Sequence, residues 1–214
     1  MKRYISFILI FLFIFSFSTG YLNAENNEKI DENFDEEINE EIDNEFDEQY
    51  FKEVRDNCAQ TLVKLNILKG YEDGTLRLNN KILRSEFITL VVRLMGYHKD
   101  TDIDNIEINF KDIEENHWAY DNIKLAIKYN IVTGYPDNTI APNNNVTYAE
   151  ALAVIINALG YEDTLDGEWP DNVVEKATEL KLDKNLNIEA NTQITRGEMS
   201  VLIYNALTVP LKSD

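Results

Sequence analysis

Three stretches of the chain repeat the same pattern of apolar positions. Each has apolar residues at i, i+3, i+4 and i+7, which is the spacing of one face of an α-helix. The three sets are Phe87, Leu90, Val91 and Leu94; Ala151, Val154, Ile155 and Ala158; and Met199, Leu202, Ile203 and Ala206. Gly96 and Gly160 follow the first two sets and are predicted to end those helices, because glycine accepts the left-handed conformation common just past a helix end.

A second helix is predicted upstream of each of these stretches. Its apolar positions are Val54, Ala59, Leu62, Val63 and Ile67 in the first copy; Trp118, Ile123, Ala126, Ile127 and Ile131 in the middle copy; and Trp169, Val174, Ala177, Thr178 and Leu182 in the last. A helix pair of this size cannot bury its apolar face alone. We therefore predict an all-α domain in which three helix-loop-helix repeats turn similar stripes towards a shared axis.

The loops inside the repeats also match. Residues 70–76 read GYEDGTL and return at 134–140 as GYPDNTI, with equal lengths from the glycine to Glu86 and Glu150. The last copy lacks Gly-Tyr, reads Asn185-Leu186 near that point, and has a loop about three residues shorter. Asparagine tolerates a left-handed conformation, so the turn can survive there.

A short motif opens the second helix of each repeat. It reads ILRSE at 82–86, VTYAE at 146–150 and ITRGE at 194–198. The last two have the threonine-to-glutamate spacing of a capping box, in which each side chain bonds a backbone N–H of the other residue. We interpret these glutamates as helix caps and predict no enzyme, because carboxylate acid-base catalysis needs a second acid held opposite in a cleft.

The first 24 residues have the pattern of a signal peptide. Lys2 and Arg3 precede an apolar run from Ile5 to Phe17, and small residues follow up to Ala24. The run is shorter than the roughly 20 residues that a spanning helix needs, so we predict secretion with no membrane span after signal removal. The single cysteine, Cys58, rules out a disulfide framework and is predicted to be a small core residue.

Charge narrows the range of partners. The formal net charge is −19, which argues against nucleic acids and anionic lipids as partners.

Residues 25–49 form an acidic arm whose apolar residues recur at every fourth position. A solvated or partly helical arm and a dedicated binding helix both remain open, and the arm could recruit another envelope protein. We predict no cofactor or metal, because these acids lack a turn-forming glycine and His98 and His117 are isolated.

The loop and helix-start motifs together resemble those of S-layer homology modules. The match runs from about residue 50 to 211, with repeats at 50–97, 108–161 and 166–211. The resemblance implies a pseudo-threefold helical assembly, at the cell wall or cell surface, that binds secondary cell-wall polymers, often pyruvylated, in grooves between repeats. Two positions depart from the family pattern. Tyr148 replaces the expected arginine, and Leu83 replaces the threonine.

Seven side chains are candidates for glycan binding. They are Arg84, Arg196, Tyr148, Trp118, Trp169, Tyr71 and Tyr135. Arg84 and Arg196 fall in the first turn of their helices, where a positive charge opposes the helix dipole by about 0.3–1 kcal/mol. Two anions could offset this cost: a structural carboxylate of a neighbouring repeat, or a ligand carboxylate, such as a pyruvyl ketal, held by the guanidinium and by free N–H groups of the helix start.

The aromatic candidates have two interpretations as well. Trp118 and Trp169 could stack on sugar faces, and Tyr71 and Tyr135 could hydrogen-bond sugar hydroxyls. All four could instead pack in the core or in a groove wall. A different function also stays open, since the departure at Tyr148 and the eroded last loop fit a protein-interaction module that has kept the fold and lost glycan binding.

Overall fold

The computed structural model describes residues 32–212, with side chains from residue 47 onward. The predicted signal peptide, 1–24, lies outside the described residues. The chain divides into two units, Met1–Glu45 and Phe46–Asp214. The helices are α2 (Glu32–Lys64), α3 (Arg84–Leu94), α4 (Tyr120–Lys128), α5 (Tyr148–Leu159), α6 (Asp171–Glu179) and α7 (Arg196–Ala206), with short 3₁₀ helices η2 (Tyr97–Lys99) and η3 (Glu162–Thr164). Within 32–212 the only β-type pairings are isolated bridges, so the all-α prediction is confirmed.

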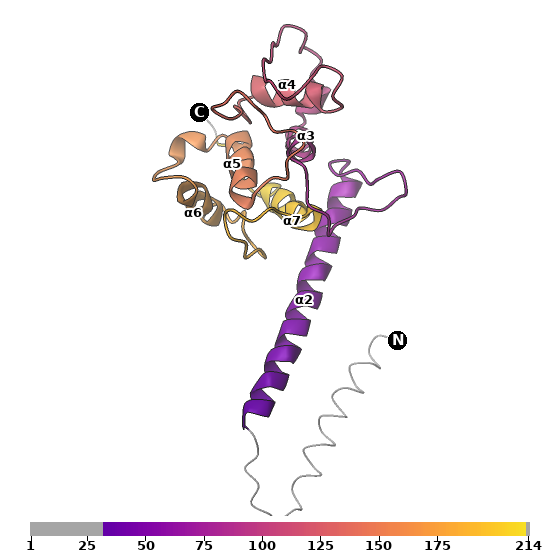
Figure 1. Cartoon of the computed structure of the whole chain (residues 1–214), viewed down its shortest axis with the longest axis vertical. Helices are drawn as coiled ribbons and strands as arrows, with labels where there is room; N and C mark the ends of the chain where they lie inside the picture. The colour runs from indigo at the N-terminus through magenta and orange to yellow at the C-terminus, as the bar shows by residue number, and fades with distance from the viewer. Residues whose placement is uncertain (1–31, 213–214) are drawn as a thin grey trace, which may run out of the picture. The chain divides into compact units, whose positions relative to one another are not determined.

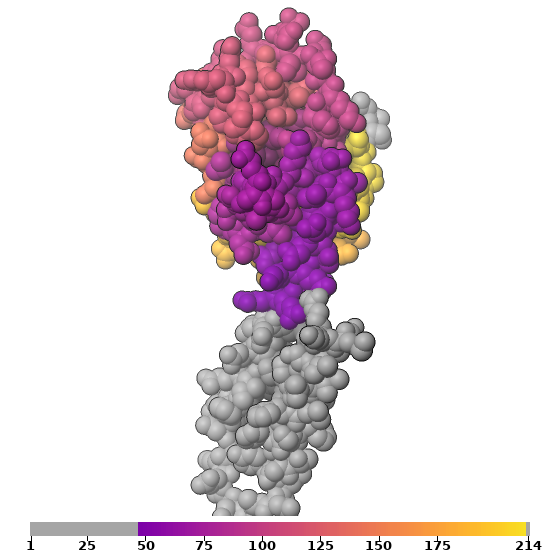
Figure 2. All heavy atoms as spheres, turned by 90° about the vertical axis from the view of Figure 1, so that its right-hand side faces the viewer, coloured from indigo at the N-terminus to yellow at the C-terminus, as the bar shows by residue number. Residues whose placement is uncertain are grey.

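The second helices of the repeats form the centre of the larger unit. α3 contacts α5 and α7, and α5 also contacts α7 (Figure 1). α4 packs on α3 and α6 packs on α5, so the first helix of one repeat covers the second helix of the repeat before it. Figure 2 shows the face on which the first repeat, in indigo and purple, borders the second. The apolar positions predicted on α3, α5 and α7 are buried, except Leu94, which is half-buried.

A ring of hydrogen bonds joins the segments just before these three helices. The Ile82 N–H donates to the Ile194 carbonyl, the Ile194 N–H to the Val146 carbonyl, and the Val146 N–H to the Ile82 carbonyl, each at 3.1 Å. Each repeat therefore donates to one neighbour and accepts from the other. This cyclic pattern is consistent with the pseudo-threefold arrangement, which stays a prediction.

Several local predictions are confirmed. Gly96 and Gly160 have φ of 75° and 83° at the ends of α3 and α5, and Asn185 takes the same left-handed region with φ 64°. Cys58 is a buried core residue, and burial raises the pKa of its thiol. Besides these confirmed predictions, in the loop of the first repeat the Asp73 carboxylate accepts from the Thr75 N–H at 2.9 Å, as is common for aspartate in turns.

Part of the predicted acidic arm is helical. α2 begins at Glu32 and continues without a break into the first repeat, so residues 32–49 of the arm belong to this helix. Its side chains up to residue 46 lie outside the described part, and a partner for the arm stays a prediction. Among residues 32–212, no helix combines the length and the apolar character needed to cross a bilayer.

Candidate functional site

The repeats meet at three equivalent junctions, each named here by its residues. The first junction comprises Arg196, Glu86 and Tyr71; the second comprises Arg84, Glu150 and Tyr135; the third comprises Tyr148, Glu198 and Asp183. In each case the helix start of one repeat enters the loop region of the next. At the first junction, for example, the N–H groups of Arg196 and Gly197 donate to the carbonyls of Asn80 and Leu78, both at 2.8 Å.

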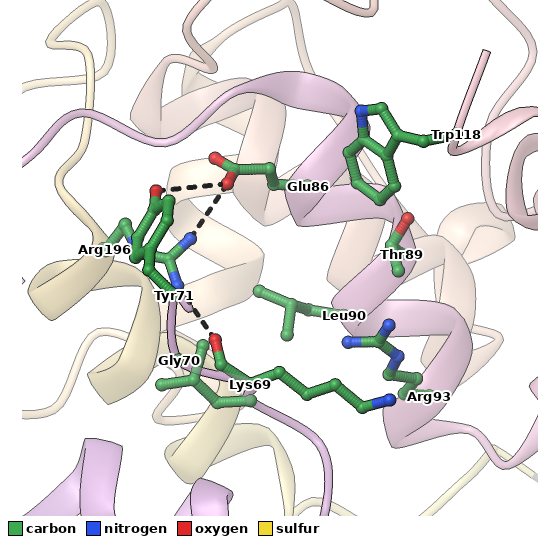
Figure 3. A pocket seen from close by; sticks show the side chains of 10 residues that line it. Lys69, Gly70, Tyr71, Glu86, Thr89, Leu90, Arg93, Trp118 and Arg196 are labelled. Atoms are coloured by element: carbon green, nitrogen blue, oxygen red, sulfur yellow. Dashed lines mark hydrogen bonds and ion pairs between the residues drawn. The ribbon is translucent and has the colours of Figure 1, made fainter. Parts of the chain in front are cut away.

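A hollow opens at the first junction and is called the first pocket below. Its lining residues are Leu68, Lys69, Gly70, Tyr71, Glu86, Thr89, Leu90, Arg93, Trp118 and Arg196. All three repeats contribute to it (Figure 3). The cavity volume of the hollow is about 180 Å³, which is smaller than the roughly 300–1,000 Å³ of sites for drug-sized ligands.

The Arg196 side chain is buried and interacts with a carboxylate, two backbone carbonyls and an aromatic ring. Its side chain is 5% exposed, and its Nη1 atom lies 3.1 Å from Oε1 of Glu86. Nε donates to the Leu76 carbonyl at 2.9 Å and Nη2 to the Lys69 carbonyl at 3.3 Å. The guanidinium carbon also lies 4.9 Å from the centre of the Tyr71 ring, within reach of a cation–π interaction. All three guanidinium nitrogens therefore already donate within the protein.

Glu86 serves two repeats at once. Its Oε2 accepts from the Leu83 N–H at 3.1 Å, which satisfies one free donor at the start of α3. Its Oε1 accepts from Arg196 of the last repeat and, at 3.4 Å, from the Tyr71 hydroxyl. Leu83 has no side-chain acceptor, so α3 has only the glutamate half of a capping box. The full boxes predicted at Thr147 with Glu150 and at Thr195 with Glu198 are confirmed.

The second junction repeats these contacts more loosely. Arg84 is buried, and its Nε donates to the Ile140 carbonyl at 3.1 Å, but its Nη1 is 4.0 Å from Oε1 of Glu150. Tyr135 donates a hydrogen bond to Glu150 and lies under the Arg84 guanidinium at 4.8 Å. Burial and the bond to Glu150 raise the pKa of the Tyr135 hydroxyl to about 12. Both arginines thus meet a structural carboxylate of a neighbouring repeat, the first of the two anions predicted for them.

The third junction has no arginine. Tyr148 takes that place and is buried, and burial together with the charge of Asp183 raises the pKa of its hydroxyl to about 12. Asp183 accepts from the Thr178 hydroxyl at 2.6 Å. An apolar ring therefore fills the space that a guanidinium occupies at the other two junctions.

The alternative in which a ligand anion uses free N–H groups beside Arg84 in α3 or Arg196 in α7 is contradicted for α7. In α7 the N–H groups of Arg196 and Gly197 donate to carbonyls of the first repeat, and that of Glu198 donates to the Thr195 hydroxyl. The first two N–H groups of α3 likewise donate to carbonyls of the second repeat. Contacts between repeats and the cap of α7 take these donors, so they are not free to bind an anion.

Of the two packing roles considered for the tryptophans, core and groove wall, the core role is wrong for both. Trp118 is 57% exposed and Trp169 is 54% exposed, because both lie in the turns just before α4 and α6. Trp118 stands at the edge of the first pocket (Figure 3). The helical spacing of the sequence had placed both rings on a buried helix face. The helices start later, at Tyr120 and Asp171.

Three pocket residues were missed from the sequence: Lys69, Arg93 and Thr89. Neither cation forms an ion pair with any side chain described here; Arg93 Nη1 only donates to the Ile67 carbonyl at 3.4 Å. Partial burial lowers the pKa of Arg93 from its usual range, yet a guanidinium stays charged at neutral pH. They could have been found by comparing the first two repeats, because the second repeat has Thr133, Asn157 and Ala153 at the equivalent positions.

Comparison with known proteins supports the same modules. The model of the S-layer homology domain matches residues 59–88 and 109–152, which lie in the first two repeats. The chain belongs to the S-layer homology family. The matched segments include the helix starts and loops that build the first two S-layer homology modules.

Several relatives carry similar S-layer homology regions. The middle cell wall protein of Brevibacillus brevis is 34% identical over 73% of this chain and 15% of its own length. A cell surface protein of Thermoanaerobacter kivui is 34% identical over 75% of the chain and 22% of its own length. A cellulosome-anchoring protein of Acetivibrio thermocellus is 37% identical over 65% of the chain and 35% of its own length. The chain thus spans a small part of these relatives, and family and relatives together place it at the cell surface.

Proposed function

We propose that this chain attaches non-covalently to the bacterial cell envelope by binding an anionic, pyruvylated secondary wall polysaccharide, with the first pocket as its main binding site. One observation carries the proposal. In a chain with net charge −19, the first pocket brings Lys69, Arg93 and Arg196 together with a single carboxylate, that of Glu86. A local excess of positive charge in a concave site favours an anionic ligand.

Trp118 supports a sugar as the ligand. Its ring is more than half exposed at the edge of the pocket, and a solvent-facing indole beside polar groups suits stacking on the apolar face of a sugar ring. Exposing so large an apolar surface gives the fold little stability, so a binding role is the better explanation. The names of the relatives, which include cell wall, surface and anchoring proteins, agree with envelope attachment.

Sedimentation with bacterial walls tests the proposal. Purified chain is mixed with native walls that carry pyruvylated secondary polymer and with walls stripped of that polymer by acid. We expect sedimentation with native walls only, weakening as salt rises because the contact is ionic. Equal sedimentation with both preparations, or with neither, would contradict the proposal and favour a protein-interaction module.

Two tryptophan variants form a matched pair for this assay. Trp118→Ala removes the ring at the first pocket, whereas Trp169→Ala removes the equivalent ring in the last repeat. Both rings are more than half exposed, so neither change should unfold the chain. We expect Trp118→Ala to weaken sedimentation about tenfold and Trp169→Ala to change it much less, because only Trp118 lines the first pocket. Equal losses would contradict a main site at the first pocket.

A further inference from the structure

The arginine that the sequence singles out at the first pocket is already neutralised. Arg196 has the Glu86 carboxylate 3.1 Å from Nη1, and its other two nitrogens donate to backbone carbonyls. A ligand carboxylate at Arg196 would compete for this guanidinium with Glu86, which also caps α3. Drawing the cation away from Glu86 would leave a partly buried carboxylate without its counter-charge, which is unfavourable.

Lys69 and Arg93 are in the opposite situation. Both line the pocket, and neither pairs with a carboxylate within the part of the chain whose side chains are described. Figure 3 shows the Lys69 and Arg93 side chains on one side of the pocket, with Arg196, Glu86 and Tyr71 grouped on the other side and Leu90 between. The positive charge that remains free is therefore at the Lys69 and Arg93 end.

Thr89 adds an independent observation. Its side-chain oxygen is buried, its residue is 2% exposed, and the hydroxyl has no hydrogen-bond partner among the described residues. Native proteins rarely leave a buried hydroxyl without a partner. Thr89 lies on the same helix as Arg93 and on the pocket side that carries Trp118 (Figure 3). A ligand oxygen in the pocket would give this hydroxyl its missing partner.

The second repeat shows that the fold does not require these three residues. The equivalent positions hold Thr133, Ala153 and Asn157. Asn157 keeps the structural bond of this position, donating to the Ile131 carbonyl at 3.3 Å as Arg93 donates to Ile67. The second repeat thus folds without Lys69, Arg93 and Thr89, so these three side chains are not needed for the repeat fold.

We propose that Lys69, Arg93 and Thr89 form the subsite that holds the ligand's carboxylate, and that Arg196 joins the repeats and shapes the pocket wall. The inference rests on the proposed function, since it takes an acidic sugar as the ligand. Lys69 and Arg93 supply the charge, and Thr89 donates a hydrogen bond. Trp118 would then cover the sugar ring beside the carboxylate. The second and third junctions lack this set and bind acidic sugar weakly or not at all.

The second repeat supplies the variant for a test. Lys69→Thr, Thr89→Ala and Arg93→Asn, made together in the full chain, give the first pocket the residues found at the second junction. A control variant, Lys181→Asn with Lys184→Thr, removes the same positive charge from the last repeat, outside the first pocket. Lys181 has φ 60°, close to the φ of 59° and 54° of Asn66 and Asn130 at the equivalent positions, so asparagine fits its backbone.

The probe is a methyl hexoside with a 4,6-linked pyruvyl ketal, titrated calorimetrically as the free acid and as its uncharged methyl ester. We expect the acid to bind the wild-type chain and the control variant equally, with about one site per chain. The triple variant should bind at least about tenfold more weakly, and the ester should bind weakly to all three, because charge-assisted hydrogen bonds are lost in both cases. Melting curves followed by circular dichroism check that all three chains are folded.

Retained acid binding in a folded triple variant would overturn the inference, as would equal binding of acid and ester. Sedimentation of the same proteins with native walls separates this failure from failure of the proposed function. If the wild-type chain sediments with native walls but does not bind the acid probe, the carboxylate subsite is wrong and envelope attachment stands. If it binds neither walls nor probe, both proposals are overturned.

Discussion

The first and second junctions use the same residue types and hold them differently. At the first junction, Arg196 is 3.1 Å from Glu86 and donates from all three nitrogens, whereas at the second Arg84 is 4.0 Å from Glu150 and only Nε makes a bond within hydrogen-bonding distance. The first junction also opens into a pocket with two unpaired cations. The arginine and glutamate of the motif therefore join neighbouring repeats at both junctions. The residues around them determine whether a ligand can bind.

The third junction extends the comparison. Tyr148 shows that the junction can be closed by an apolar ring, without any guanidinium. The arginine is therefore one of two ways to fill this space. The differences among the repeats lead to three predictions about stability.

The largest difference is expected between the two arginines. Arg196→Met should lower the free energy of unfolding by about 3 kcal/mol, because it leaves the partly buried Glu86 carboxylate without its cation and removes the donor to two backbone carbonyls. Arg84→Met should cost about 1 kcal/mol, since it removes one close hydrogen bond and a long ion pair. Urea denaturation followed by circular dichroism measures both. Equal losses would show that the two junctions are equally tight in solution.

The loop glycines give the next prediction. A Cβ atom added at Gly134, which has φ +79°, would lie 2.4 Å from the Phe110 ring and 2.9 Å from the Thr139 carbonyl. Gly134→Ala should therefore cost about 2 kcal/mol from overpacking and backbone strain. At Gly70 the nearest atom is the Thr75 carbonyl, at 3.1 Å, and the backbone is not left-handed.

Gly70→Ala is the control for this effect and should cost less than about 1 kcal/mol, because the carbonyl needs to move by only a few tenths of an ångström. Thermal unfolding of the two variants compares them directly. A larger loss for Gly70→Ala than for Gly134→Ala would reverse the expected order and contradict the packing seen around Phe110.

The smallest effect concerns the missing half of the first capping box. Leu83→Thr should stabilise the chain by about 0.5–1 kcal/mol, because the threonine hydroxyl can accept from the Glu86 N–H as Thr147 and Thr195 do in their repeats. Thr195→Val is the opposite change and should destabilise by a similar amount. The stability changes of both variants are measured from the midpoints of urea denaturation, provided that the m-value is unchanged. A destabilising Leu83→Thr would mean that the leucine contributes more by packing than the cap would.

Much of the fold could be predicted because it depends on local patterns. The i, i+3, i+4, i+7 spacing located the buried faces of α3, α5 and α7, and the threonine-to-glutamate spacing located two complete caps. These features involve residues within one or two helical turns, so the sequence order determines their geometry. The same argument failed for Trp118 and Trp169, because a spacing rule does not say where the first helical turn begins.

The sequence by itself determined the repeats, their helices, the family and the positions of two arginines that need an anion, because each follows from residue order and from charge near a helix end. Only the tertiary structure decided which anion each arginine meets, since Glu86 and Arg196 lie at opposite ends of the domain in sequence and come together only when the first and last repeats pack. It also decided that the free positive charge lies at Lys69 and Arg93. Whether a cation is available to a ligand depends on the carboxylates that folding brings beside it.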